Sequence, residues 1–77
     1  MEMTRTFNGR TYLMEEIGRG LGWVKSAAGE LLLGFSLDES SGATHALGYR
    51  GGEWRGADLE DVLSRALREI EDAEVLR

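Results

Sequence analysis

The segment that decides the fold is residues 3–14, which read MTRTFNGRTYLM. Asn8-Gly9 tolerates the positive φ angles of a type I′ turn, and the threonines and aromatic residues on either side suit strands. A two-residue loop would place Phe7 opposite Arg10. Alternation would then put Tyr12 and Met14 on the same face as Phe7. We therefore expect a hairpin with strands at about 3–7 and 10–14.

Three more strand-like segments follow, at about 21–26, 31–37 and 43–49, and residues of turn composition separate them. This order predicts an antiparallel meander. Alternation within each strand divides the side chains into a large apolar face and a flat face of small residues. We expect the large face to hold Leu21, Trp23, Leu31, Leu33, Phe35, Leu37, His45, Leu47 and Tyr49, and the flat face to hold Gly22, Val24, Leu32, Gly34, Ala46 and Gly48.

The last segment changes the period of its apolar residues from two to about 3.6, as an amphipathic helix requires. Asp58 suits the N-cap position and Asp61 adds a carboxylate to the positive end of the helix. The sequence predicts a helix at about 58–74, and its apolar stripe consists of Leu59, Val62, Leu63, Ala66, Leu67, Ile70 and Ala73. The expected fold is α+β: one domain over 1–77, with an antiparallel meander of four to five strands and the C-terminal helix packed on one face.

Composition excludes several kinds of site. The chain has 77 residues, no cysteine and one histidine, so it can form neither a disulfide nor a thiolate zinc site. Its longest apolar run is Leu31-Leu32-Leu33, and its first residues lack the pattern of a secretory signal. We expect a cytoplasmic protein with no membrane partner, no cofactor and no metal.

Catalytic patterns are weak. His45 is the one side chain whose ordinary pKa lies near neutrality. Serines and Asp38 lie nearby in the sequence, but nothing resembles a nucleophile elbow or an oxyanion loop, so we interpret His45 as a histidine at the core margin. The glycine-rich run 18–22 lacks the helix that must follow a phosphate-binding loop, and is interpreted as a turn. The sequence predicts that the protein is not an enzyme.

The net charge of −5 is concentrated near the C-terminus. Residues 57–77 carry seven acidic and three basic residues, whereas residues 1–56 carry seven and six. Such a field favours basic partners, and its acidic row could imitate a nucleic-acid backbone; an ordinary solvated helix face is the alternative. Glu69 and Asp72 are the candidate partner-binding residues of this face.

A second candidate surface lies in the run 49–56, which interleaves aromatic residues with arginines. Single-stranded nucleic-acid binders use that combination for stacking and phosphate contact. The acidic total argues against such binding, and Trp54 also suits a plug beneath the start of the helix. We take Arg50, Trp54 and Arg55 as candidate contacts with a partner protein.

The flat face offers a third surface, because glycines inside strands are typical of places where another backbone approaches closely. Gly22, Gly34 and Gly48 occupy such positions, so a second copy of the chain could pack there. The alternative is a solvent face with local curvature. This pattern predicts a homodimer.

These features favour a small acidic module that binds another protein or a ribonucleoprotein complex. The most concrete version is an inhibitor or accessory protein, of the kind that phages direct against host defence complexes. The alternative is a homodimeric module that uses its sheet face or edge. The run 54–63, WRGADLEDVL, resembles the strand-to-helix junction of small antitoxins of the HicB class, which implies an antitoxin-like role; the proline-rich loop of that junction is missing, since the chain has no proline.

Overall fold

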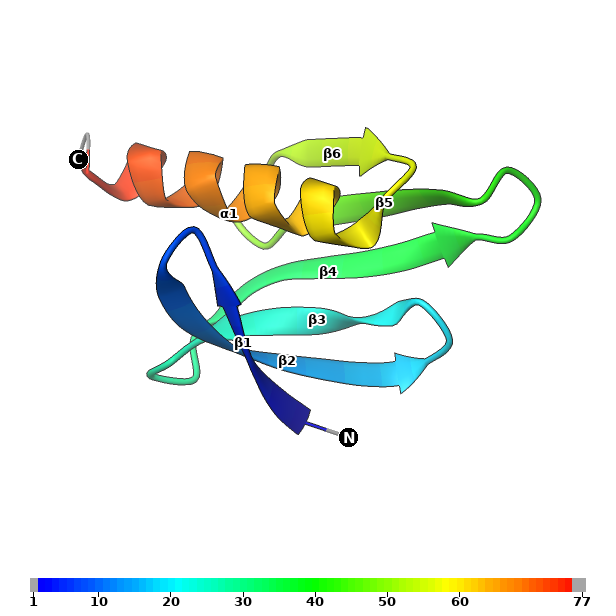
Figure 1. Cartoon of the computed structure of the whole chain (residues 1–77). Helices are drawn as coiled ribbons and strands as arrows, with labels where there is room; N and C mark the ends of the chain where they lie inside the picture. Colours follow the sequence, from blue (N-terminus) through cyan, green and yellow to red (C-terminus); the bar gives the residue numbers. More distant parts are fainter. Residues whose placement is uncertain (1, 76–77) are drawn as a thin grey trace.

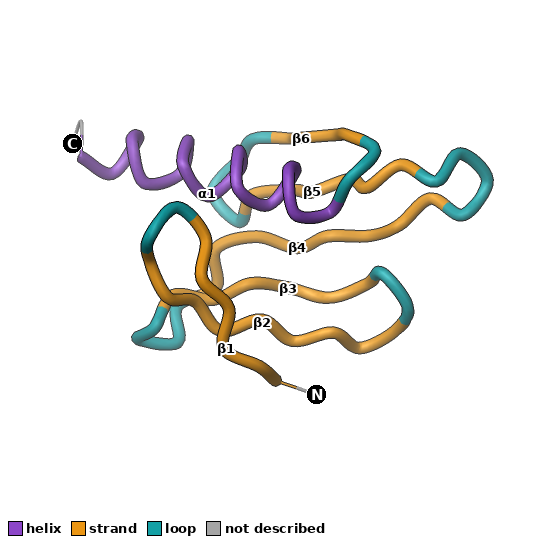
Figure 2. Tube along the Cα trace, viewed as in Figure 1, coloured by secondary structure: helices purple, strands orange, loops and turns teal. Residues whose placement is uncertain are grey.

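The computed structural model describes residues 2–75, with the side chain of Val75 left out. Its architecture is a six-stranded antiparallel sheet with one C-terminal helix on one face (Figures 1 and 2). The strands follow one another across the sheet in chain order. The elements are β1 (Glu2–Phe7), β2 (Arg10–Gly18), β3 (Leu21–Ser26), β4 (Leu31–Asp38), β5 (Ala43–Gly48), β6 (Glu53–Gly56) and α1 (Leu59–Val75). The α+β class and the meander are thus confirmed.

The first hairpin forms with the expected register. Asn8 and Gly9 have φ values of 54° and 79°, as a type I′ turn requires. Phe7 pairs with Arg10, and Tyr12 and Met14 lie on the same face as Phe7. All three of these apolar side chains are buried. The hairpin therefore supplies one wall of the core.

Two strand assignments change. β2 continues through residues 15–18, past its expected end at about residue 14. It ends after an irregularity in the pairing between Glu16 and Gly18. The run 53–56, expected as a loop, is the edge strand β6 and pairs with β5. Six strands therefore form where four to five were expected. β6 is short and follows two glycines with positive φ, Gly51 and Gly52, which concealed its strand pattern.

The two faces of the central sheet also differ from the prediction. Phe35 pairs with Ala46 on β5 and with Gly22 on β3, so Ala46 and Val24 lie under the helix with Leu33 and Phe35. Trp23, His45 and Leu47 lie on the opposite face, which we call the open face. Alternation gives the faces of one strand but not their phase relative to the next strand. The turn 39–42 sets that phase: it holds an even number of residues and joins Asp38 to Ala43, so odd positions of β4 pair with even positions of β5.

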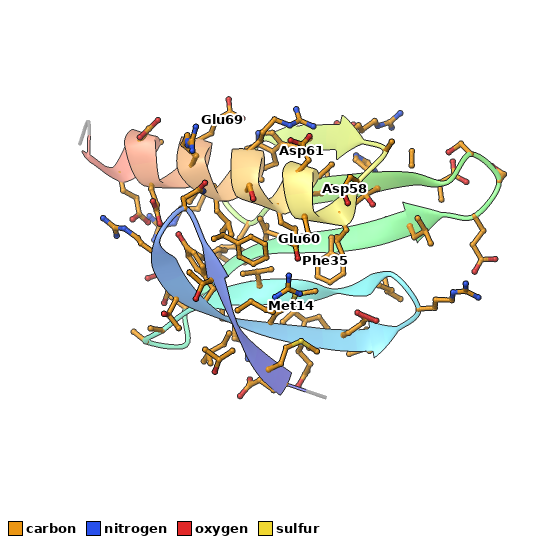
Figure 3. All side chains as sticks on the ribbon, in the orientation of Figure 1. Met14, Phe35, Asp58, Glu60, Asp61 and Glu69 are labelled. Atoms are coloured by element: carbon orange, nitrogen blue, oxygen red, sulfur yellow. The ribbon has the colours of Figure 1, made fainter. Side chains whose placement is uncertain are left out.

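The core lies between the helix and this covered face. Four consecutive members of the helical stripe are fully buried, and they pack on Met14, Leu33 and Phe35 (Figure 3 labels Met14 and Phe35). Leu59 and Ile70 are only partly buried at the two ends of the stripe, and Ala73 is exposed. The four buried stripe residues are Val62, Leu63, Ala66 and Leu67. The helix thus runs past its core at the C-terminal end.

The strand glycines accommodate this chain's own backbone. A Cβ at Gly22 would collide with the carbonyl oxygen of Glu15, and one at Gly48 would collide with that of Gly51. Of the three glycines expected inside strands, Gly34 alone has room, with its nearest neighbour at 3.7 Å. Since Gly22 and Gly48 lie on the covered face and Gly34 lies on the open face, the expected flat face for a second chain does not form.

Polar contacts tie the helix to the two ends of the sheet. Arg65 pairs with Asp61 one turn earlier in the helix at 3.1 Å and also donates to the Arg55 carbonyl at 2.6 Å. Arg68 donates to the Asn8 side chain at 3.2 Å, while Asn8 donates to the Ser64 carbonyl at 2.8 Å. The helix arginines therefore serve tertiary contacts as well as the helix surface. None of the helices described in residues 2–75 is long and apolar enough to cross a membrane.

Candidate functional site

A groove lies beneath the C-terminal half of α1, where the helix projects past the end of the sheet (Figure 1). Three adjoining hollows form it, and Ile70 and Glu74 line all three. The two larger hollows measure about 180 and 200 Å³ and lie on the Trp54 side and the Tyr12 side of the groove. We call this surface the helix groove. Its apolar floor is Leu32, Ile70 and Ala73.

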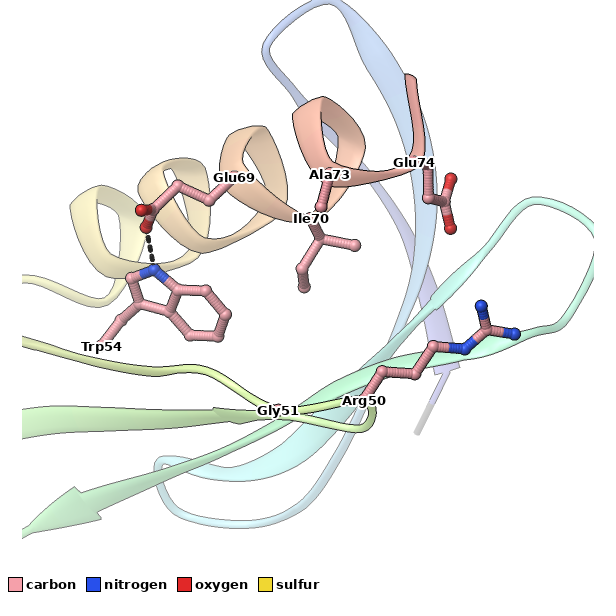
Figure 4. A pocket seen from close by; sticks show the side chains of 7 residues that line it. All are labelled: Arg50, Gly51, Trp54, Glu69, Ile70, Ala73 and Glu74. Atoms are coloured by element: carbon pink, nitrogen blue, oxygen red, sulfur yellow. Dashed lines mark hydrogen bonds between the residues drawn. The ribbon is translucent and has the colours of Figure 1, made fainter. Parts of the chain in front are cut away.

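Trp54 builds one wall of the helix groove. Its indole N–H donates a hydrogen bond to the Glu69 carboxylate across the gap between β6 and α1 (Figure 4). The loop before β6 lies directly against the ring: a Cβ on Gly52 would meet three ring atoms of Trp54 at 2.5 to 3.2 Å. The Gly48 amide donates to the Gly52 carbonyl at 3.0 Å and closes this loop. The wall is therefore held in place before any partner arrives.

Arg50 and Glu74 form the rim on the same side. The Arg50 guanidinium donates to Glu30 at 3.5 Å. In Figure 4 it points toward the Glu74 carboxylate from the opposite wall. The rim thus places charges of both signs around a hollow whose floor is apolar, which is typical of a site that fixes the orientation of an apolar ligand.

The far end of the helix groove is anchored by Glu71. This carboxylate is partly buried, accepts a hydrogen bond from the Tyr12 hydroxyl and lies 3.5 Å from the Arg10 guanidinium. Tyr12 itself is buried in the core. The helix is thus tied to the first hairpin at the same turns where it is tied to β6.

The structure brings three of the five candidate residues together at one hollow: Arg50, Trp54 and Glu69. Arg55 lies elsewhere, because alternation along β6 turns it to the open face, where its guanidinium is 3.4 Å from Glu53. Asp72 is exposed on the helix and lines none of the hollows. Trp54 packs against the helix near Glu69 rather than beneath its start.

Sequence reasoning missed the floor of this site. Ile70 and Ala73 belong to the apolar stripe, which was assigned to the core. No local signal marked this, because the stripe from Leu59 to Ala73 is about 21 Å long and strands of six to eight residues span a similar length. The position of α1 over the sheet, and not its length, places Ile70 and Ala73 at an edge of the core.

The open face offers a second, flatter surface. Leu21 and Leu47 are 45% and 53% exposed, and they flank a hollow of about 240 Å³ that Ser36 and His45 also line. Trp23 lies on the same face, and its indole nitrogen is buried without an acceptor among the described residues. The charged side chains of Glu53 and Arg55 lie on the same face. Since α1 covers the other face, where the helix groove lies, the helix groove is the more enclosed of the two surfaces.

His45 is engaged in an ion-pair geometry on the open face. Its Nε2 lies 2.9 Å from Glu53, and Ser36 is its register partner on β4. Within residues 2–75 no hydrogen bond joins Ser36 to His45. Asp38 instead accepts from the side chain and amide of Ser40. The hydrogen bond from the Ser40 hydroxyl, followed by those from the Ser41 hydroxyl and the Ser40 amide, lowers the pKa of Asp38. The serine, histidine and aspartate of the sequence thus do not converge on one site.

In the described part of the chain, no group of three or more histidine or acidic side chains is arranged to hold a metal ion. Comparison of the chain with protein-family models, curated proteins and solved structures found no match. The functional argument therefore rests on the geometry of the helix groove and the open face.

Proposed function

We propose that this chain is a non-catalytic protein-binding module of the cytoplasm, and that it binds its partner through the helix groove. The observation that carries the proposal is the hollow at Arg50, Trp54 and Glu69, where an apolar floor lies inside a charged rim. Its most concrete form is an inhibitor or accessory protein that covers a surface of another protein or of a ribonucleoprotein complex.

Three properties of the helix groove support this role. Its wall is preformed by the hydrogen bond from Trp54 to Glu69, so a partner does not have to order it. Its floor leaves Ile70 only partly covered, so binding would bury apolar surface. Its Trp54-side hollow is lined by both a tryptophan and an arginine, residue types that often dominate the binding energy at interfaces.

Affinity capture from a lysate of the source organism tests the proposal, with the tagged full chain as bait. Ala73→Gln fills the Trp54-side hollow with a good helix former at an exposed position. Leu47→Gln is the matched control on the open face, also at an exposed position. We expect the partner identified with the wild-type chain to be lost with Ala73→Gln and kept with Leu47→Gln. The opposite pattern would contradict the proposal.

A homodimer that packs through the open face is the second candidate function. The exposed Leu21 and Leu47 favour it. Light scattering decides: a mass near twice 8.5 kDa for the wild type that falls to 8.5 kDa with Leu47→Gln supports the dimer. A mass of 8.5 kDa for both the wild type and Leu47→Gln at ~100 micromolar, a concentration at which weak association is detectable, would rule out the dimer.

A further inference from the structure

The charges of the helix groove identify the chemistry of its occupant. Four carboxylates line the three hollows, from Glu30, Glu69, Glu71 and Glu74, against two guanidinium groups, from Arg10 and Arg50. Both arginines already have carboxylate partners, Glu71 and Glu30. The remaining carboxylates are those of Glu69 and Glu74, and both line the Trp54-side hollow.

These two carboxylates keep their negative charge available. Glu69 accepts its hydrogen bond from a neutral indole, which leaves its charge uncompensated. Glu74 faces Arg50 in Figure 4, but the Arg50 guanidinium is bonded to Glu30. Among residues 2–75 no ion pair involves Glu69 or Glu74. A cation placed at the rim of this hollow would therefore meet carboxylates on the helix side.

The shape of the helix groove favours a polypeptide over a small molecule. Its three hollows, of about 180, 40 and 200 Å³, lie along the groove as recesses rather than as one compact cavity of the ~300–1,000 Å³ that small-molecule sites usually occupy. The two larger hollows lie on either side of Ile70, and Glu74 borders both. Two separate recesses along one groove suit successive side chains of one chain better than a single compact ligand.

We infer that the helix groove takes a polypeptide segment in which aliphatic or aromatic anchors stand next to lysine or arginine. The anchors fill the hollows beside Ile70, and the cations contact Glu69 and Glu74. This inference rests on the proposed function and adds the chemistry of the partner to it.

A titration with three short capped peptides tests the inference on the full chain. One peptide alternates leucine with lysine, one alternates leucine with glutamate, and one alternates serine with lysine. The readout is the δ1-methyl spectrum of isoleucine, which has only two signals, from Ile70 in the helix groove and Ile17 in the irregular part of β2. We expect the leucine–lysine peptide to shift Ile70 and leave Ile17 unchanged, and the other two peptides to bind at least about ten-fold more weakly, since each lacks either the anchors or the cations.

Charge variants complete the test. Glu69→Gln and Glu74→Gln should each weaken the leucine–lysine peptide by about two- to five-fold, the range for one exposed ion pair. Glu39→Gln removes the same charge from the exposed turn between β4 and β5 and should leave the affinity unchanged. The inference is overturned if the leucine–glutamate peptide binds equally well, if Glu39→Gln weakens binding as much as Glu74→Gln, or if no peptide shifts Ile70. Failure of the proposed function is a separate result: partner capture would then survive Ala73→Gln, whatever the peptides do.

Discussion

The indole N–H of Trp54 on β6 donates to the carboxylate of Glu69 on α1 and joins the edge of the sheet to the helix that covers it. The same contact forms the wall of the helix groove. The stability of the fold and the binding of a partner therefore both depend on this pair of residues. Substitutions at Glu69 and Trp54 can measure the two effects separately.

Loss of the Glu69 acceptor should destabilise the fold modestly. Glu69→Ala is expected to lower the free energy of unfolding by about 0.5–1.5 kcal/mol, as for other single hydrogen bonds, while Glu69→Gln keeps an acceptor and loses less. Urea unfolding measures both. In a double-mutant cycle with Trp54→Phe, the two substitutions should be coupled, because each removes the same hydrogen bond. Strictly additive effects would show that the contact contributes nothing.

The strand glycines give a prediction that separates close packing within one chain from packing against a second copy. Gly22→Ala places a Cβ against the Glu15 carbonyl and should cost about 1–3 kcal/mol, the usual range for overpacking. Gly34→Ala meets only an atom at 3.7 Å and should leave stability unchanged or raise it by up to about 1 kcal/mol.

Thermal or urea unfolding of the two glycine variants at several protein concentrations checks this. A large loss at Gly34 that grows on dilution would instead indicate that another chain packs on the open face.

The register of β4 and β5 can be tested at two leucines. Leu33 is fully buried under the helix, so Leu33→Ala should cost about 2–5 kcal/mol. Leu47 is 53% exposed on the open face, and Leu47→Ala should change the free energy of unfolding by no more than about 0.5 kcal/mol. Similar losses at both positions would contradict the assignment of faces.

Asp38 gives a prediction about pH. The Ser40 hydroxyl and amide, with Ser41, lower the pKa of Asp38 in the folded protein. Its contribution to stability is therefore present above the ordinary pKa of about 3.9 and is lost as the pH falls through the lower folded value. Ser40→Ala should raise the pKa of Asp38, which carboxyl ¹³C titration measures. Ser36→Ala, which lies outside this turn, is the control, and an unchanged Asp38 midpoint in Ser40→Ala would refute the assigned cause.

Local signals in the sequence were enough for most of the fold. The turn at Asn8-Gly9 fixed the first hairpin because its two positive φ angles leave one register, and the 3.6-residue stripe located the helix. Which residues of β5 share a face with which residues of β4 could not be predicted in the same way, because the alternation within each strand is compatible with either arrangement. Turn 39–42 decides it through the pairing of Asp38 with Ala43.

The candidate site could likewise be predicted only in part. The residues at 50 and 54 were noticed for their chemistry, and Glu69 for its charge, and the structure places all three at one hollow. Their meeting depends on where the helix lies over the sheet, which no local pattern specifies. Arg55 was grouped with Trp54 by proximity in the chain, and the alternation of β6 separates them.

The most direct test of binding through the helix groove uses the two tryptophans, since Trp54 lies in the groove and Trp23 on the open face. Indole ¹⁵N–¹H spectra of the labelled full chain would be recorded with and without the purified partner. The expected result is a shift of the Trp54 signal while the Trp23 signal keeps its position. A shift of Trp23 with Trp54 unchanged would contradict binding through the helix groove.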